Sequence, residues 1–345
     1  MTSRPTPPRA GSGFTLIELL VSMAIITVLL LIFATLTDRT AKIWRSTRGK
    51  VSQFQQARDA FETITSNLSQ ATLNTYLDYY DASGARRENT NASTFVPDRY
   101  GRYSDLRFLS GQAATILQKP AEQSPTHALF FYAPLGETGV PANAALNHLL
   151  NLTGYYITYG EDTERPDFLP TVPTYGYRLM EFKQRSENLT PLGGEERWPP
   201  DVAEHPDAHI IARNIIAIIF LPKLPSQGPA GDPSVDPTGQ DLAPLYTYDS
   251  LTVGQGGLRK ELNSLNQLPP IIEVTMVAID DASAERSGRE STPPDLGLGE
   301  LFTDADPDKR KTDLETLLQT LKDKRLNARV FSTEVSLKSA KWSRE

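Results

Sequence analysis

Residues 14–36 form an apolar run in which Glu18 is the one ionisable side chain. A run of this length crosses the hydrocarbon core of a bilayer as a helix. A secretory signal has a shorter apolar core with a small-residue cleavage site after it, whereas Gly13 precedes the run here. A carboxylate inside a bilayer is costly, so Glu18 is a candidate functional residue. The pattern predicts a membrane helix with a functional carboxylate near its start.

Apolar positions then recur at alternating spacings of three and four, at Trp44, Thr47, Val51, Phe54, Ala57, Phe61, Ile64, Leu68 and Ala71. This period is typical of an amphipathic helix. No proline occurs between Pro8 and Pro97. The sequence therefore predicts one helix from Phe14 to about Leu73, whose apolar stripe packs on the soluble part of the protein.

Beyond this helix the period changes. Residues 78–102 are polar, and within this stretch residues 83–87 and 89–93 are expected to form surface loop. Short runs rich in β-branched and aromatic residues follow, separated by glycine and proline, at residues 105–110, 128–135, 154–159, 175–183, 215–221, 271–279 and 330–337. These runs predict about seven strands, and the proline-rich insert 222–241 is expected to be mobile. The expected fold is α+β, a long N-terminal helix packed on an antiparallel β-sheet body.

Charge and cysteine content narrow the function. The 345 residues carry a formal net charge of −7, and without Arg4 and Arg9 the balance is 33 basic to 42 acidic residues, or −9. A body of this charge argues against nucleic acid as a partner. The absence of cysteine excludes disulfides, thiol catalysis and thiolate metal sites. The two arginines before the apolar run favour a cytoplasmic N-terminus, which places the rest of the chain outside the cytoplasm.

The basic leader and the residues that follow it, Gly-Phe-Thr-Leu-Ile-Glu-Leu-Leu-Val at 13–21, resemble the N-terminus of type IV prepilins and pseudopilins. The resemblance implies that a membrane prepilin peptidase cuts after Gly13 and N-methylates Phe14. It also makes Glu18 the glutamate at the fifth position of the mature chain. Other pseudopilins or minor pilins in a bacterial inner membrane would be the partners, and no cofactor is implied.

The resemblance also implies how the chain is divided. Residues 1–13 would be the prepilin leader, 14–36 the transmembrane assembly helix, 37–77 its amphipathic continuation and 78–345 an extracytoplasmic, periplasmic β-rich domain with long loops. The helical stretches 56–62 and 67–71, the proline-led stretch 268–276 and the size of the chain are most similar to the J-type minor pseudopilins of type II secretion. The chain also resembles the large prepilin-like proteins called Verru_Chthon cassette protein C.

Cleavage after Gly13 would create an α-amine at the start of a helix, one turn before the Glu18 carboxylate. Neither charge is well solvated in a membrane. In a bundle of such helices, the carboxylate of an incoming subunit can meet the amine of a subunit already in place. This contact fixes register more than it adds stability. Glu18 is therefore expected to act in assembly, not in catalysis.

No catalytic motif is evident. The four histidines, His127, His148, His205 and His209, have no metal-site spacing, and Pro206 makes a solvated loop the expectation for His205 and His209. Neither a nucleophile elbow nor a phosphate-binding glycine loop is present. The sequence thus predicts a protein without catalytic activity.

A weak calcium alternative comes from Asp304, Asp306, Asp308 and Glu315, which occupy positions 1, 3, 5 and 12 of a calcium-loop pattern. Lys309 stands where the loop needs glycine, and two more basic residues follow it. The favoured interpretation is that Thr312 caps a helix in which Glu315 completes a capping box. Its buried face would consist of Leu314, Leu317, Leu318 and Leu321.

The leading hypothesis is a minor pseudopilin-like subunit that enters the tip or the initiation complex of a type II secretion-like pseudopilus. A minor pilin of a type IV pilus or of a competence system is the alternative within the class. A membrane-anchored periplasmic enzyme or ligand-binding ectodomain is the alternative of another class, and its support is the size of the body and its aromatic strands.

Overall fold

The computed structural model describes residues 16–89, 93–161, 174–189, 198–202, 205–226, 235, 242–252, 264–288 and 290–342. The side chains of Glu18, Asp38 and residues 41–53 also lie outside this description. The chain divides into two units, Met1–Val51 and Ser52–Glu345. Helix α1 (Leu16–Ser69) begins in the first unit and ends in the second.

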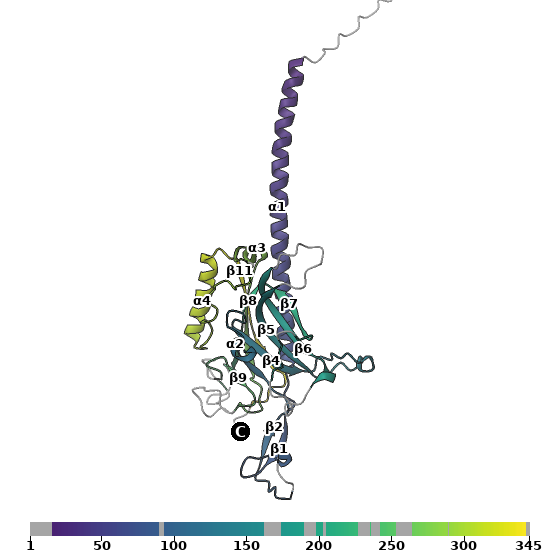
Figure 1. The fold of residues 1–345 in the computed structure, drawn as a ribbon, viewed down its shortest axis with the longest axis vertical. Coiled ribbons are helices and arrows are strands. Elements are labelled where there is room, and N and C mark those ends of the chain that lie inside the picture. Colours follow the sequence, from purple (N-terminus) through teal and green to yellow (C-terminus); the bar gives the residue numbers. More distant parts are fainter. Residues whose placement is uncertain are drawn as a thin grey trace, which may run out of the picture. The chain divides into compact units, whose positions relative to one another are not determined.

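The second unit holds two main antiparallel sheets and a separate hairpin (Figure 1). The six-stranded sheet has the order β7-β6-β5-β4-β3-β9 and the three-stranded sheet the order β11-β10-β8. The strands are β1 (Tyr76–Tyr80), β2 (Arg99–Tyr103), β3 (Leu109–Gln112), β4 (His127–Ala133), β5 (Asn151–Glu161), β6 (Tyr175–Gln184), β7 (Ala208–Arg213), β8 (Ile215–Lys223), β9 (Tyr248–Asp249), β10 (Ile271–Ile279) and β11 (Ala328–Ser336). The helices are α2 (Ala113–Leu117), α3 (Asp281–Arg286) and α4 (Pro307–Asp323), with single 3₁₀ turns at Arg87–Asn89, Pro141–Asn143 and Ser186–Asn188. The expected α+β fold with an antiparallel sheet body is confirmed.

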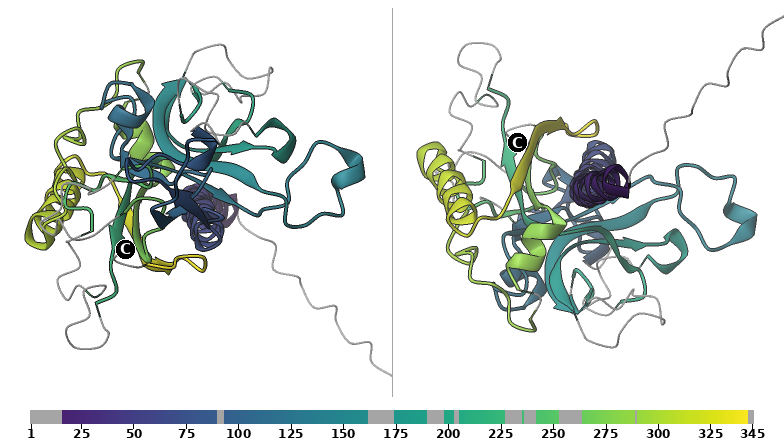
Figure 2. Two further views of the ribbon diagram at one scale, coloured as in Figure 1. Left: turned by 90° about the horizontal axis from the view of Figure 1, so that it is seen from below. Right: turned by 90° about the horizontal axis from the view of Figure 1, so that it is seen from above.

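The last part of α1, from Ser52 onward, lies between the two main sheets (Figure 2). Its apolar stripe is buried from Ala57 to Leu68, as the period predicted, and Ala71 is buried just after the helix. The ring of Phe61 lies 5.8 Å from that of Phe331 on β11, between ring centroids. The helix ends at Ser69, before the residues 73 and 77 to which the sequence extended it, and β1 begins at Tyr76. The stripe residues Trp44, Thr47 and Val51 lie outside the described side chains.

A single buried histidine joins the two sheets. His127, at the start of β4, accepts a hydrogen bond at Nδ1 from the backbone N–H of Phe220 on β8, at 3.1 Å. Its Nε2 lies 2.9 Å from the carbonyl oxygen of Phe302, to which it donates. Thr126 accepts from the N–H of Ile218 at 3.1 Å in the same way. These side chains satisfy donors on the edge of β8 that no strand of the described chain pairs. Burial lowers the pKa of His127 to about 4, so its ring is neutral at pH 7.

The polar stretch 78–102 holds more regular structure than the loops expected at 83–87 and 89–93. Strands β1 and β2, which were not predicted, pair over five residues in a hairpin that projects from the body (Figure 1). The loop expected at 83–87 lies in the connection between these strands. Arg86, which lies between them in sequence, is buried. Its Nε lies 2.9 Å from Asp78 Oδ2, and its guanidinium carbon lies 3.3 Å from the ring centroid of Tyr103. A two-stranded sheet is marginal by itself. The buried guanidinium of Arg86 pairs with Asp78 and stacks on Tyr103, and it thereby provides the packing that the hairpin would otherwise lack.

Several other expectations need correction. Strands β7 and β9 were not predicted, and the strand expected at 105–110 is β3, which begins at Leu109. Strand β8 extends to Lys223, into the expected proline-rich insert. Residues 227–234 and 236–241 of that insert lie outside the described residues, as do the leader residues 1–13.

Helix α4 begins at Pro307, not after Thr312. Asp306 is its N-cap and accepts from the backbone N–H groups of Asp308 and Lys309. Thr312 donates to the carbonyl of Asp308 inside the helix, at 2.8 Å. The predicted buried face is confirmed, since Leu317 and Leu321 are buried and their neighbours Leu314 and Leu318 pack partly buried on the core.

Candidate processing and assembly site

The residues of the expected processing site precede the structured helix. Gly13 and Phe14 lie outside the described residues. Glu18 belongs to α1, two residues after its first residue, Leu16, and its side chain is not described. Their roles in cleavage, methylation and assembly therefore remain predictions from the sequence.

The segment Leu19–Thr37 of α1 is apolar on every side. Its mean hydropathy is 2.8, and none of it is buried against the protein. Among the described residues it is the one helical stretch long and apolar enough to cross a membrane. A helix that is apolar all round needs apolar surroundings, because exposing it to water forgoes the free energy of burial. This segment therefore supports membrane anchoring through the N-terminus.

Four hydroxyl groups interrupt this apolar segment, and each has its hydrogen bond inside the helix. Ser22 donates to the carbonyl of Leu19 at 2.9 Å. Thr27, Thr35 and Thr37 donate to carbonyls three or four residues earlier, at 2.7 to 2.8 Å. A polar group left unpaired in hydrocarbon costs several kcal/mol. Since each hydroxyl donates within its own helix, none of them needs a hydrogen-bond acceptor from lipid or from another helix.

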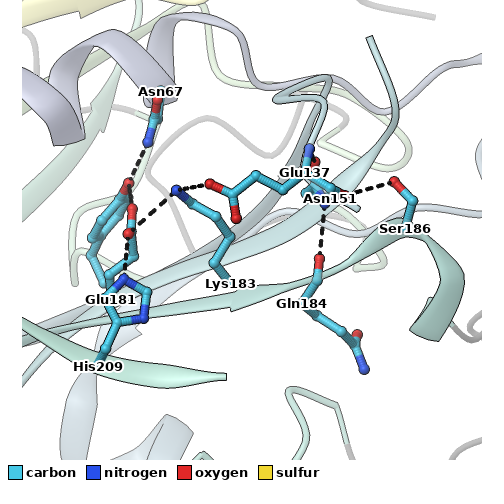
Figure 3. A network of polar contacts seen from close by, with 9 residues as sticks. Asn67, Glu137, Asn151, Glu181, Lys183, Gln184, Ser186 and His209 are labelled. Carbon is cyan, nitrogen blue, oxygen red and sulfur yellow. Dashed lines mark hydrogen bonds and ion pairs between the residues drawn. The ribbon is translucent and has the colours of Figure 1, made fainter. Parts of the chain in front are cut away.

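In the body, a polar network ties the end of α1 to the six-stranded sheet (Figure 3). Its centre is Glu181 on β6, which is only 4% exposed. One carboxylate oxygen accepts from the hydroxyl of Tyr155 at 2.7 Å. The other lies 2.9 Å from Nε2 of His209 and 3.4 Å from Nζ of Lys183. Asn67 of α1 donates to the same Tyr155 oxygen at 2.8 Å. The helix end is thus hydrogen-bonded to the centre of the sheet.

The network continues to the ends of β5 and β6. Lys183 donates to a carboxylate oxygen of Glu137 at 2.8 Å. The buried amide of Asn151 accepts from the N–H of Glu137 at 3.0 Å and donates to the carbonyls of Glu137 and Gln184. Ser186 donates to the carbonyl of Leu150 at 2.6 Å. These bonds fix the loop after β4 against the β5–β6 pair.

Burial alone would raise the pKa of Glu181, but the hydrogen bonds from His209 and Tyr155 and the charge of Lys183 outweigh it and lower the pKa. The hydrogen bond to Glu181 raises the pKa of His209 above 6.5. Burial raises the pKa of Tyr155 well above 10, so its hydroxyl keeps its proton. In mildly acidic solution Glu181 is therefore ionised while His209 is protonated, and the two form a charged pair. No side chain of the network is an activated nucleophile, so it is suited to holding structure together.

This pair predicts a pH dependence of stability. A raised pKa for His209 contributes stability that is complete below pH 6.5 and is lost as the pH rises through the folded-state pKa. A lowered pKa for Glu181 contributes stability that is complete above pH 4.5 and is lost as the pH falls. We expect wild-type protein to lose more thermal stability between pH 6 and 8 than His209→Gln, which keeps a donor but does not titrate. His148→Gln, an exposed histidine elsewhere, is the control. Parallel melting curves of wild type and His209→Gln across this range would contradict the expectation.

The expected solvated loop for His205 and His209 is wrong for His209, which lies on β7 and bonds to Glu181. His205 precedes that strand and is partly buried. Sequence reasoning missed the network because the contacts that tie its centre to β5 and to α1 join residues 26 and 88 positions apart. The one available signal was Glu181, an acidic residue at an inward position of the predicted strand 175–183.

The residues of the calcium alternative are used otherwise in this structure. Asp306 caps α4, Asp304 accepts from the N–H of Asp306 at 3.0 Å, and Lys309 Nζ lies 3.5 Å from Asp304 Oδ2. Within the described residues, no group of three or more histidine, aspartate or glutamate side chains is placed to hold a metal ion. Glu315 is an exposed residue in the middle of α4.

The fold and the N-terminal helix define a class: a protein with a membrane-anchoring apolar helix followed by an α+β body of antiparallel sheets. Residues 9–34 match the family model of the prokaryotic N-terminal methylation motif. The matched stretch spans Gly13, Phe14 and Glu18, and it supports a type IV prepilin-like N-terminus that is a substrate of prepilin peptidase. No curated protein and no solved structure matches the chain.

Proposed function

We propose that this protein is a minor pseudopilin-like structural subunit that is cut after Gly13, N-methylated on Phe14 and incorporated into the tip or initiation complex of a type II secretion-like pseudopilus. The observation that carries the proposal is the methylation motif at 9–34 directly overlapping an apolar helix that no part of the described protein covers. A helix of this kind has two possible environments, the bilayer and a bundle of similar helices. A prepilin-type subunit uses both in turn.

Under this proposal the N-terminus is cytoplasmic before cleavage and the body is periplasmic. The prepilin peptidase and the other subunits of the filament are the partners. The body has no catalytic role, which agrees with the structural use of its charged pair, Glu181 and His209. A type IV pilus or competence system shares the same N-terminal chemistry. Neighbouring genes distinguish the systems, since a secretin with cargo enzymes favours secretion and a retraction ATPase favours a pilus.

The size of the body supports a place at an end of the filament. A repeating subunit must pack against copies of itself at a short axial rise, so extra bulk is penalised at every step. Here the chain from Asp280 to Asp308 adds α3 and a segment that buries Leu296, Leu298 and Phe302. The hairpin of β1 and β2 projects further. A single copy at a tip avoids that crowding.

N-terminal mass spectrometry of the native membrane protein tests the proposal. We expect the chain to begin with N-methylated Phe14. A chain that begins at Met1, or an unmethylated terminus at another residue, would show that the protein is an ordinary membrane-anchored ectodomain.

Glu18→Val should separate processing from assembly. The substitution makes the segment more apolar, so insertion and cleavage should proceed. Incorporation should fall at least tenfold, because the incoming helix has no carboxylate to pair with the neighbour's amine. The measurement is cross-linking to the other filament subunits in cells. Ser22→Val, one turn further on, is the matched control, since its hydroxyl bonds only to its own helix. Equal incorporation of both variants would show that Glu18 has no assembly role.

A further inference from the structure

A polar cavity of about 300 Å³ lies where the hairpin of β1 and β2 leaves the body. Four segments distant in sequence line it: the connection between α1 and β1, β2, the chain before β10 and the chain after β11. The lining residues are Thr72, Leu73, Asn74, Thr75, Arg102, Asn266, Gln267, Leu268, Lys338, Ser339 and Lys341.

Backbone hydrogen bonds hold these walls in place. The N–H of Thr72 donates to the carbonyl of Tyr132 at 2.8 Å, and the N–H of Asn266 donates to the carbonyl of Ser250 at 2.7 Å. The Asn266 side chain donates to the carbonyl of Arg102 at 2.9 Å. The N–H of Lys338 donates to the carbonyl of Ser69, the last residue of α1, at 3.1 Å. The cavity is therefore pre-formed, as ligand sites usually are.

The charged side chains among the described lining residues all have the same sign. Arg102, Lys338 and Lys341 are cationic, and no carboxylate is among the lining residues that the structure describes. This reverses the balance of the whole chain, in which 42 acidic residues outnumber 35 basic ones. Most of the remaining lining consists of amides and hydroxyls, which donate to and accept from sugar-like hydroxyl groups and oxyanions. Cations that converge in a concave surface concentrate anions there.

We propose that this cavity binds a phosphate monoester of a small polar molecule. A phosphate monoester carries close to two negative charges at neutral pH and presents several acceptor oxygens, which matches the exposed Lys338 and Lys341 better than a single carboxylate does. The cavity is larger than one phosphate group, and its amides and hydroxyls suit a hydroxylated remainder of the ligand. The ligand would join the C-terminal segment to the base of the hairpin. This inference does not depend on the N-terminal processing.

The test uses the full-length protein in lipid nanodiscs and measures binding by isothermal titration calorimetry. One arm adds glucose 6-phosphate to nanodiscs of phosphatidylcholine, with glucose and sodium chloride of equal ionic strength as blanks. The other arm incorporates phosphatidic acid into the nanodiscs and measures whether it abolishes glucose 6-phosphate binding. The first arm detects a soluble phosphate ester, and the second shows whether a lipid headgroup of the same chemistry takes its place.

We expect saturable binding of glucose 6-phosphate that weakens at least tenfold when Lys338→Gln and Lys341→Gln are combined. Both side chains are exposed, so the variant should fold, which its melting temperature checks. Lys322→Gln combined with Lys324→Gln, an equally exposed pair on and after α4, is the matched control and should bind normally. Competition by phosphatidic acid would identify the headgroup as the occupant. The proposal is overturned if glucose 6-phosphate does not bind saturably, or if the two double variants bind it equally.

Discussion

Gly13→Val should leave the protein as an uncut precursor in the membrane. A peptidase that cuts after this residue must take an extended, unhindered backbone into its active site. A β-branched side chain there adds a steric clash that glycine avoids. We expect mature protein to fall below a tenth of the wild-type amount. The measurement is the N-terminal mass of the membrane-bound chain, which should begin at Met1 or its processed equivalent and carry no methyl group at Phe14.

Gly11→Val is the matched control, because it places the same side chain in the same leader two residues earlier. It should be cut normally. Normal amounts of mature, methylated protein from Gly13→Val would remove the basis of the prepilin interpretation. Poor cleavage of both variants would instead show that the leader as a whole, not the residue before the cut, is being recognised.

His127→Phe should destabilise the body by about 2–3 kcal/mol at pH 7. The substitution keeps an aromatic ring of similar size but leaves the N–H of Phe220 buried without its acceptor, and an unsatisfied buried donor costs about 1–3 kcal/mol. The carbonyl of Phe302 loses one donor and keeps the hydrogen bond from Gln112 at 2.7 Å. Chemical denaturation followed by tryptophan fluorescence measures the difference. His148→Phe, at an exposed position, should change little.

The same variant should be less sensitive to acid. His127 has a pKa of about 4 in the folded protein and 6.5 as its ordinary value, so the unfolded chain binds more protons between these limits. As the pH falls from 6.5 through 4, wild type therefore loses about 3 kcal/mol of stability through this residue. Phenylalanine cannot titrate, so the gap between the two proteins should narrow in acid. A gap that is constant with pH would show that His127 is not buried in its neutral form.

Local patterns predicted much of the fold. The helical stripe at Ala57, Phe61, Ile64 and Leu68 is an amphipathic period, and it is buried as expected. Strand β10 was placed at its observed bounds, and β8 could be recognised because it is an apolar run buried on both faces. Each of these elements can be recognised from the residues within it, without knowledge of what it packs against. Their partners in the sheets could not be assigned, because pairing joins residues far apart in sequence.

The elements that were missed lack such a local signal. Every residue of β1 and β2 is exposed or half-buried, because this hairpin covers no core. Its stability depends on Arg86, a charged residue in a polar stretch. The start of α4 had a signal, an aspartate before a proline, but the acidic spacing and Thr312 offered competing interpretations.

The functional residues likewise fall into those with a local sequence signal and those without one. The processing motif at residues 13–18 can be recognised from sequence because its chemistry lies in consecutive residues. The role of His127 cannot, because its partners Phe220 and Phe302 are 93 and 175 residues away. The cavity beside Arg102 is likewise assembled from four segments that no sequence pattern connects.

The four hydroxyls of Leu19–Thr37 bear on how such a helix changes its environment. Each is already bonded to a carbonyl of its own helix. Extraction from lipid into a protein bundle would therefore break no hydrogen bond of these groups and require none to form. The helix could also rotate about its axis or slide along a neighbour without an energetic penalty from them. Transfer of the subunit from lipid into the bundle would then depend on side-chain packing and on the Glu18 carboxylate. The transfer would be reversible until this carboxylate pairs with the α-amine of a neighbouring subunit.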